Sequence, residues 1–467
     1  MYYSSTVSRY EKYGVSLRAW LMGGAGRGDN NQSQRRHHMP TARVSASSRS
    51  RVIMVPLVPF MTLVMLLSPA KPSLALPRSC SQHTRPAFIS TGISSLGTIL
   101  RPAFALDNAH HRPAAVAATS MAAGVGKGSP PRSTNTKTVI YRPLSIDVGD
   151  VRVPVAAWYP PDDHDDVTTI TKVDTFYEHR ISISKIGKFL AGWTLPSFFD
   201  RNFSLKPTLV DVRTLLSSGE RRGLPKSCPV VLLAHGFLGS RFDLSHLGEA
   251  LASGGFLVLS PEYPESLAAS YDVTQSTIAG IPIDRRIITD TLLKSLTTEW
   301  GVLPEAYGIV GHSLGCGTVD GTGDETWTRV CLAGGYPSLR GPNCLFVGSI
   351  NDGAVPLIRA AGALRENNFE FLEEEAVRSR LWEILPSRAA IIFRNQSNAP
   401  NHISFLAEGP NDAMVEFLSP LLPVASALGI PVLDFDKYQL SRDSKATGEV
   451  VVPLIVDYLK QKMIPTI

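Results

Sequence analysis

A serine flanked by glycines restricts the fold of this chain more than any other feature. Two buried-type apolar residues precede the stretch Gly311-His-Ser313-Leu314-Gly315, and small residues follow it. A serine on a tight turn from a strand into a helix needs a strained backbone angle, so the residues two positions before and after it must be very small. Gly311 and Gly315 meet this requirement. The pattern predicts that the Ser313 hydroxyl stands above a sheet edge as a nucleophile, with the Leu314 N–H aimed at developing negative charge.

A second signal lies upstream, where five consecutive apolar residues, 230–234, end in His235-Gly236-Phe237. Such a run is typical of a strand buried on both faces, as in a parallel sheet. We expect the Phe237 backbone N–H to be the second oxyanion donor and Gly236 to allow close approach. His235 is expected to orient this loop by hydrogen bonds and not to take part in catalysis.

A serine hydroxyl needs a base to take its proton, and the base needs a carboxylate to fix its tautomer. His402 is the only histidine after His312, and it follows an expected strand. It is therefore the predicted base. Asp352 follows the expected strand before that one and is the predicted acid. Other candidates for the acid are Glu262, Asp320 and Asp324, the last two of which lie close to Ser313 in sequence. His312 and Cys316 are interpreted as packing residues.

The rest of the region after residue 137 alternates between strand and helix patterns. An antiparallel hairpin is expected at 138–160, with its turn at Gly149-Asp150. Strands are expected at 229–234, 256–259, 309–310, 329–333, 344–349 and 389–393, and helices at 244–255, 282–300 and 450–462. This alternation predicts an α/β fold with a mostly parallel sheet and helices on both faces.

Residues 174–205 form an unusual segment within an insert or cover at 162–227, because aromatic and aliphatic residues alternate with basic ones. One interpretation is a lid, or a segment that contacts a membrane surface, over an apolar substrate site. The other is a pair of helices packed on the sheet with their basic residues facing water. The two interpretations are compatible.

The charge of the chain is divided unevenly. Residues 1–140 hold 17 Lys and Arg but 3 acidic residues, which leaves 29 basic and 38 acidic residues in 141–467. An acidic body argues against nucleic acid as a partner. Residues 1–136 are expected to be a leader without a stable fold. The apolar run at 52–67, which contains two prolines, fits a signal peptide, and the Ser-, Ala- and Arg-rich stretch after it fits a transit peptide.

Such a signal-plus-transit leader resembles the presequences of algae with complex plastids, and it implies a plastid location. The alternative locations are the secretory pathway and membrane association. The leader is otherwise interpreted as an ordinary disordered tail or as the result of a wrongly assigned gene start. The five cysteines are scattered without a C-x-x-C pair, and no metal or phosphate-binding motif is found. We therefore expect reduced thiols, no metal and no cofactor.

Across 229–465 the sequence resembles the α/β-hydrolase superfamily. Within it, the motifs at 235–236 and 311–315, together with Ala157-Trp-Tyr-Pro160, are similar to the group of platelet-activating-factor acetylhydrolases, dienelactone hydrolases and chlorophyllases. This chain departs from that group at Cys316, where a glycine is usual. It also lacks a carboxylate at 334–337, so the acid must be Asp352.

The resemblance and the residues together predict a serine carboxylic-ester hydrolase acting on an apolar, lipid-type ester. Hydrolysis of the phytyl ester of chlorophyll is an alternative substrate assignment. A binding protein without catalytic activity is the alternative from another class. Haloperoxidase or lyase chemistry on the same residues is a further alternative, because a fold does not determine a reaction.

Overall fold

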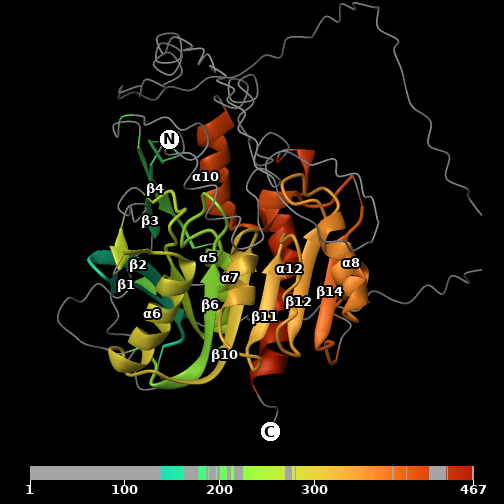
Figure 1. Cartoon of the computed structure of the whole chain (residues 1–467). Coiled ribbons are helices and arrows are strands. Elements are labelled where there is room, and N and C mark those ends of the chain that lie inside the picture. The colour runs from blue at the N-terminus through green and yellow to red at the C-terminus, as the bar shows by residue number, and fades with distance from the viewer. Residues whose placement is uncertain are drawn as a thin grey trace, which may run out of the picture. The chain divides into compact units, whose positions relative to one another are not determined.

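The computed structural model describes residues 138–161, 177–182, 184–185, 188, 196, 200–207, 212–214, 224–268, 276–278, 280–380, 383–395, 397–419, 438 and 440–464 (Figure 1). The predicted leader at 1–136 lies outside these residues, as does most of the insert at 162–227. Among the helices that are described, none combines the length and the apolar character that a bilayer span requires.

The described residues contain a ten-stranded sheet in the order β13-β14-β12-β11-β10-β6-β7-β2-β1-β5. Strands β6, β7, β10, β11, β12, β13 and β14 are parallel to one another, whereas β2 runs antiparallel to both β1 and β7. The bounds are β1 (Val139–Val148), β2 (Val151–Tyr159), β5 (Val212–Thr214), β6 (Ser227–Ala234), β7 (Leu257–Pro261), β10 (Leu303–His312), β11 (Thr328–Leu332), β12 (Cys344–Ser349), β13 (Glu370–Leu372) and β14 (Arg388–Phe393). The predicted opening hairpin and mostly parallel sheet are confirmed.

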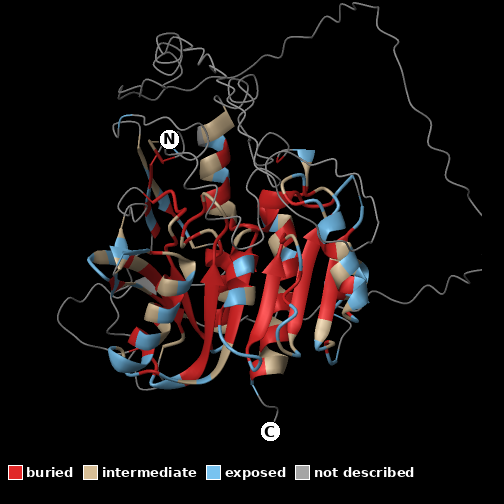
Figure 2. Ribbon diagram, viewed as in Figure 1, coloured by how far each residue is buried: buried red, intermediate tan, exposed pale blue. Residues whose placement is uncertain are grey.

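Helices cover both faces of this sheet, and the burial pattern of a single strand shows it. Along β6, Val231 and Leu233 belong to one apolar core, and Val230, Leu232 and Ala234 belong to the other. The first core is closed by α5 (Ser245–Ser253) and α12 (Ser444–Met463), and the second by α6 (Arg285–Thr298), α7 (Gly315–Gly321) and α8 (Ile358–Glu366). Figure 2 shows the buried strands between these helices. A strand with two apolar faces needs cover on both sides.

Helix α6 begins later than predicted. The sequence pattern placed Pro282 near its start, but Pro282 pairs with Thr277 in a short antiparallel ribbon of β8 (Thr277–Ile278) and β9 (Ile281–Pro282). Asp284 is the N-cap, and its carboxylate accepts a hydrogen bond from the Ile287 N–H at 2.9 Å. Aspartate is favoured at this position because it satisfies a free amide of the first turn. Arg285 therefore becomes the first residue of the helix.

The prediction of helices within 174–205 is wrong at both ends of the segment, where the structure has strands instead of helices. Strands β3 (Tyr177–Ile181) and β4 (Arg201–Leu205) pair antiparallel there. Burial alternates along β3, so its pattern has the strand period of two. Lys185 was expected to face water, but it is buried and its Nζ donates to the carbonyls of Ser266 and Ala268. Most of 186–199, on which the lid interpretation depends, lies outside the described residues.

Burial lowers the pKa of several histidines. The pKa falls to about 4 at His246 and to about 3 at His179 and His312, and it falls well below the ordinary range at His235. These side chains stay neutral in the folded state but take up protons once unfolded, so stability is lost as the pH falls below about 6.5. Each contributes a slope of about 1.4 kcal/mol per pH unit in its window.

We expect His246→Gln to reduce the pH dependence of stability. His246 lies on α5, and burial alone lowers its pKa to about 4. Between pH 6.5 and 4 the slope of the free energy of unfolding against pH should fall by about 1.4 kcal/mol per pH unit. Urea titrations of wild type and variant at pH 7.5, 6 and 5 measure the free energy of unfolding. The difference at pH 7.5, where His246 is neutral in both the folded and the unfolded state, reports the effect of packing and is subtracted from the differences at lower pH. An unchanged slope would contradict the assignment.

Candidate active site

Ser313 lies on the turn between β10 and α7 with a φ of 55°, in the left-handed region that non-glycine residues rarely occupy. Its N–H donates to the carbonyl of Leu332 on the adjacent strand at 2.9 Å, which fixes the turn against the sheet. The side chain was expected to stand exposed, but the residue is only 7% exposed. The Gly236 loop covers it, since a Cβ built on Gly236 would lie 3.2 Å from the Ser313 Cβ.

The flanking glycines are required by close backbone contacts. A Cβ built on Gly311 would lie 2.4 Å from the carbonyl oxygen of Gly315, and one on Gly315 would lie 2.0 Å from that of Ala234. Real Cβ atoms do not approach backbone oxygens so closely. The start of α7 is therefore packed directly against the end of β6, which brings the Ser313 turn and the loop after His235 together.

Replacing either of two glycines in the short helix α7 by alanine should have opposite effects on the stability of the protein. Gly315→Ala must move β6 or α7, so we expect a loss of more than about 3 kcal/mol in the free energy of unfolding. Gly317→Ala meets open space, because no described residue outside its own turn of helix lies within 4 Å of the added Cβ. It should be neutral or stabilise by up to about 1 kcal/mol. Denaturant unfolding of both variants tests this, and equal losses would contradict it.

Asp352 and His402 are in contact, although the chain separates them by 50 residues. The Nδ1–H of His402 donates to the two carboxylate oxygens of Asp352 at 3.0 and 2.9 Å, and both residues are buried. The Val355 N–H also donates to Asp352 Oδ1 at 2.7 Å. His402 begins the 3₁₀ helix η2 (His402–Phe405), which Asn401 caps together with Ser404. A carboxylate on Nδ1 leaves Nε2 as the proton acceptor.

His312 connects this pair to Ser313, and the sequence did not indicate that role. Its Nε2–H donates to the backbone carbonyl of His402 at 3.0 Å, and the two rings lie 4.8 Å apart. Burial, together with the electrostatic effect of the nearby His402, lowers the pKa of His312 to about 3, so the His312 ring is neutral. The residue directly before the serine therefore fixes the backbone of the predicted base.

The other candidate acids are engaged elsewhere. Glu262 is fully buried and forms an ion pair with Arg241 at 2.6 Å. Asp320 accepts from the Ser338 hydroxyl at 3.0 Å, and Asp324 accepts from the backbone and hydroxyl of Thr326. Cys316 is buried, and burial raises the pKa of its thiol well above the ordinary value. Its neutral thiol lies 3.3 Å from the carbonyl of Gly311, as expected for a packing residue.

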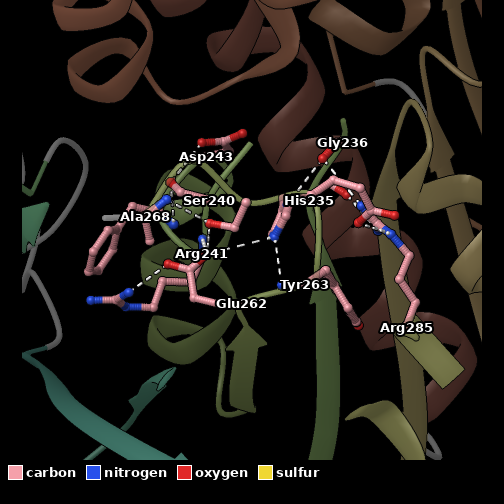
Figure 3. A network of polar contacts seen from close by, with 12 residues as sticks. His235, Gly236, Ser240, Arg241, Asp243, Glu262, Tyr263, Ala268 and Arg285 are labelled. Atoms are coloured by element: carbon pink, nitrogen blue, oxygen red, sulfur yellow. Dashed lines mark hydrogen bonds and ion pairs between the residues drawn. The ribbon is translucent and has the colours of Figure 1, made fainter. Parts of the chain in front are cut away.

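The loop after β6 is held by polar contacts (Figure 3). His235 Nδ1–H donates to the Gly236 carbonyl at 2.8 Å, and its Nε2 accepts from the Tyr263 N–H at 3.0 Å. The ring thus has a single neutral tautomer and connects this loop to the residues after β7. Gly239 N–H donates to the Gly236 carbonyl at 3.3 Å, which closes a tight turn with Leu238 at a φ of 60°. Phe237 stands inside this turn.

The strand order, the cover on both sheet faces and a strained serine between a parallel strand and a helix decide the fold. The chain has an α/β-hydrolase fold. Among the residues that the structure describes, no group of three His, Cys, Asp or Glu side chains is arranged to hold a metal ion.

Comparisons with known proteins give low similarities. No protein-family model and no curated protein matches the chain. A ferulic acid esterase from Streptomyces cinnamoneus is 18% identical, with a TM-score of 0.34 over 71% of this chain and 92% of that one. A putative dienelactone hydrolase from Klebsiella pneumoniae is 13% identical, with a TM-score of 0.30 over 61% and 98%.

The acylaminoacyl peptidase of Pyrococcus horikoshii is 12% identical, with a TM-score of 0.32 over 70% of this chain and 42% of that one. Likenesses this low carry no argument about the chemistry. The fold therefore rests on the sheet and the serine turn, and the function must be argued from the residues around Ser313.

Proposed function

We propose that this protein is a serine carboxylic-ester hydrolase with Ser313 as nucleophile, His402 as base and Asp352 as the acid that orients it. The observation that carries the proposal is the contact of both Asp352 oxygens with His402 Nδ1, next to a serine held at a φ of 55°. A strained, fixed serine and a base with a defined tautomer are the two parts that acyl transfer needs.

In the proposed reaction, His402 Nε2 takes the proton of Ser313 as its Oγ attacks the ester carbonyl. The carbonyl oxygen becomes an oxyanion, for which the N–H groups of Phe237 and Leu314 are the donors. When the C–O bond to the alcohol breaks, His402 returns the proton to the leaving oxygen. Water then attacks the acyl-serine by the same route, releasing the acid and restoring Ser313.

The proposed substrate is an apolar ester. Exposed apolar side chains lie on the segments that follow β11 and β12, the second of which carries Asp352: Ile350 follows β12, Ile358 is 82% exposed at the start of α8, and Tyr336 is exposed after β11. Their loops approach one another, since a Cβ built on Gly335 would lie 3.8 Å from Val355. Apolar groups at the carboxyl ends of the strands favour substrates with long acyl chains. Lipid esters and the phytyl ester of chlorophyll both belong to this class.

We expect Ile358→Ser to reduce hydrolysis of p-nitrophenyl palmitate about 3- to 10-fold, because the buried methylenes of a long chain lose an apolar contact. Hydrolysis of the acetate should not change. Leu303→Ser is the matched control, because Leu303 is also largely exposed, at 69%, but begins β10 and so lies at the amino ends of the parallel strands. Equal loss on both esters would contradict the assignment.

The proposed function is tested by labelling the full-length chain with a fluorophosphonate and by assaying p-nitrophenyl esters from acetate to palmitate. Labelling at Ser313, together with turnover that rises with chain length, is expected. A folded chain that is neither labelled nor active on any ester would favour the alternative, a hydrolase-fold binding protein.

A further inference from the structure

Arg285, the first residue of α6, donates two hydrogen bonds to the backbone of the loop after β6 (Figure 3). Its Nη1 donates to the His235 carbonyl at 2.8 Å, and its Nη2 donates to the Gly236 carbonyl at 3.3 Å. These are two successive peptide groups. The side chain is only 12% exposed, so the contacts are largely shielded from water. A planar guanidinium is suited to such a two-point contact, which a lysine cannot reproduce.

The Gly236 carbonyl belongs to the same peptide unit as the Phe237 N–H. A trans peptide is planar, and its C=O and N–H point in opposite directions. Fixing the oxygen therefore fixes the direction of the N–H. Three donors converge on this oxygen: Arg285 Nη2, His235 Nδ1 at 2.8 Å and the Gly239 N–H at 3.3 Å. A charged donor on the carbonyl also polarises the peptide and strengthens its N–H as a donor.

The same guanidinium reaches the helix that follows Ser313. Its Nη1 lies 3.3 Å from the Thr318 hydroxyl on α7, within hydrogen-bond distance. Helix α7 begins immediately after Leu314, whose N–H is the other proposed oxyanion donor. The contact adds to the backbone packing at Gly315, where an added Cβ would lie 3.0 Å from the His235 carbonyl oxygen. Arg285 thus joins the two chain segments that carry the two donors.

The orientation of the Arg285 side chain is itself fixed by contacts with the segment after β7. Its Nε–H donates to Glu265 at 3.0 Å, and its guanidinium carbon lies 4.5 Å from the centre of the Tyr263 ring. The Tyr263 N–H in turn donates to His235 Nε2. Each of the three guanidinium nitrogens therefore has a partner within the protein. This arrangement suits a support for the backbone better than a group that binds substrate.

We propose that Arg285 is a positioning residue that sets the direction of the Phe237 N–H and the spacing between it and the Leu314 N–H. This inference rests on the esterase function proposed above. Arg285 does not touch the reacting atoms in this assignment. Its effect should therefore appear when the oxyanion forms and not when the substrate binds.

The test compares wild type, Arg285→Gln and Arg285→Lys on p-nitrophenyl butyrate. We expect kcat to fall about 10- to 100-fold in both variants, because a displaced oxyanion donor costs about this much, and KM to stay within about twofold. The affinity for a butyl trifluoromethyl ketone, whose oxygen becomes an oxyanion when Ser313 adds to it, should fall by the same factor. The affinity for the matching methyl ketone should not change.

Arg286→Gln is the matched control, because Arg286 is the next residue but its side chain is 82% exposed. It should behave as wild type. If the Arg285 variants do not fold, Thr318→Val tests the inference instead, because it removes the hydroxyl that Arg285 contacts. We expect kcat to fall about 3- to 10-fold at constant KM.

If the wild type hydrolyses the ester and Arg285→Gln has the same kcat, the inference about Arg285 is overturned but the esterase function is not. An equal loss of affinity for both ketones would have the same consequence. So would an unchanged kcat in Thr318→Val where the Arg285 variants do not fold. Absence of wild-type hydrolysis would overturn the esterase function together with the inference.

Discussion

Ser313→Ala should reduce kcat on p-nitrophenyl butyrate by about 10⁶-fold, which is the largest effect expected of any single substitution in this chain. Alanine keeps the backbone and the packing between β10 and α7 but removes the hydroxyl oxygen that is the proposed nucleophile. The small rate that remains comes from binding and from the oxyanion donors. Folding should be unaffected, because alanine fits wherever serine fits at a φ of 55°.

The measurement is steady-state hydrolysis by the full-length variant, with circular dichroism and the urea midpoint as controls of folding. Fluorophosphonate labelling of the same samples shows whether the nucleophile has been removed. A folded Ser313→Ala protein that retains more than about a hundredth of the wild-type rate would show that another group carries out the chemistry.

Asp352→Asn should reduce kcat by about 10⁴-fold through the tautomer of His402. The Val355 N–H donates to Asp352 Oδ1, so the asparagine oxygen should take that position. The amide nitrogen then faces His402 Nδ1, where Oδ2 lies 2.9 Å away in the wild type. An amide N–H toward Nδ1 places the imidazole proton on Nε2, which then cannot accept the serine proton.

Asp320→Asn is the matched control for this substitution, because Asp320 is a competing carboxylate that accepts from Ser338 instead. It should keep the wild-type rate. The rate of Asp352→Asn should recover at high pH, where hydroxide can replace the missing base. A loss of less than about tenfold in Asp352→Asn, or an equal loss in Asp320→Asn, would contradict the assignment of the acid.

The sequence predicted the strands of the sheet well where both of their faces are buried. The run at 230–234 is continuously apolar, and its length leaves little choice of structure. The strand before Ser313 was predicted only at its buried end, 309–310, because its first residues, from Leu303, are polar or exposed in part. Strand β13 has three residues and a largely exposed pattern, so no such signal marks it. At β3, the basic and aromatic composition suggested helices, although the alternation over 177–181 follows the strand period.

Some contacts of the site could likewise be predicted from the sequence, and others could not. The chain order of a serine, a carboxylate and a single later histidine was sufficient to nominate Asp352 and His402, which the structure brings together. The contact of His312 with His402 spans 90 residues, and that of Arg285 with His235 spans 50. Neither contact has a local pattern, because a buried polar side chain takes partners from whichever segment the fold places beside it.

The alternation of β6 between two cores has a consequence for combined substitutions. Val231 and Leu232 are adjacent in the chain, but the sheet itself separates the cores into which they project. The energetic effects of truncating both should add, as they do for residues without shared partners. Val231 instead shares a core with Leu454 of α12, so coupling within this protein follows the faces of the sheet and not proximity in the chain.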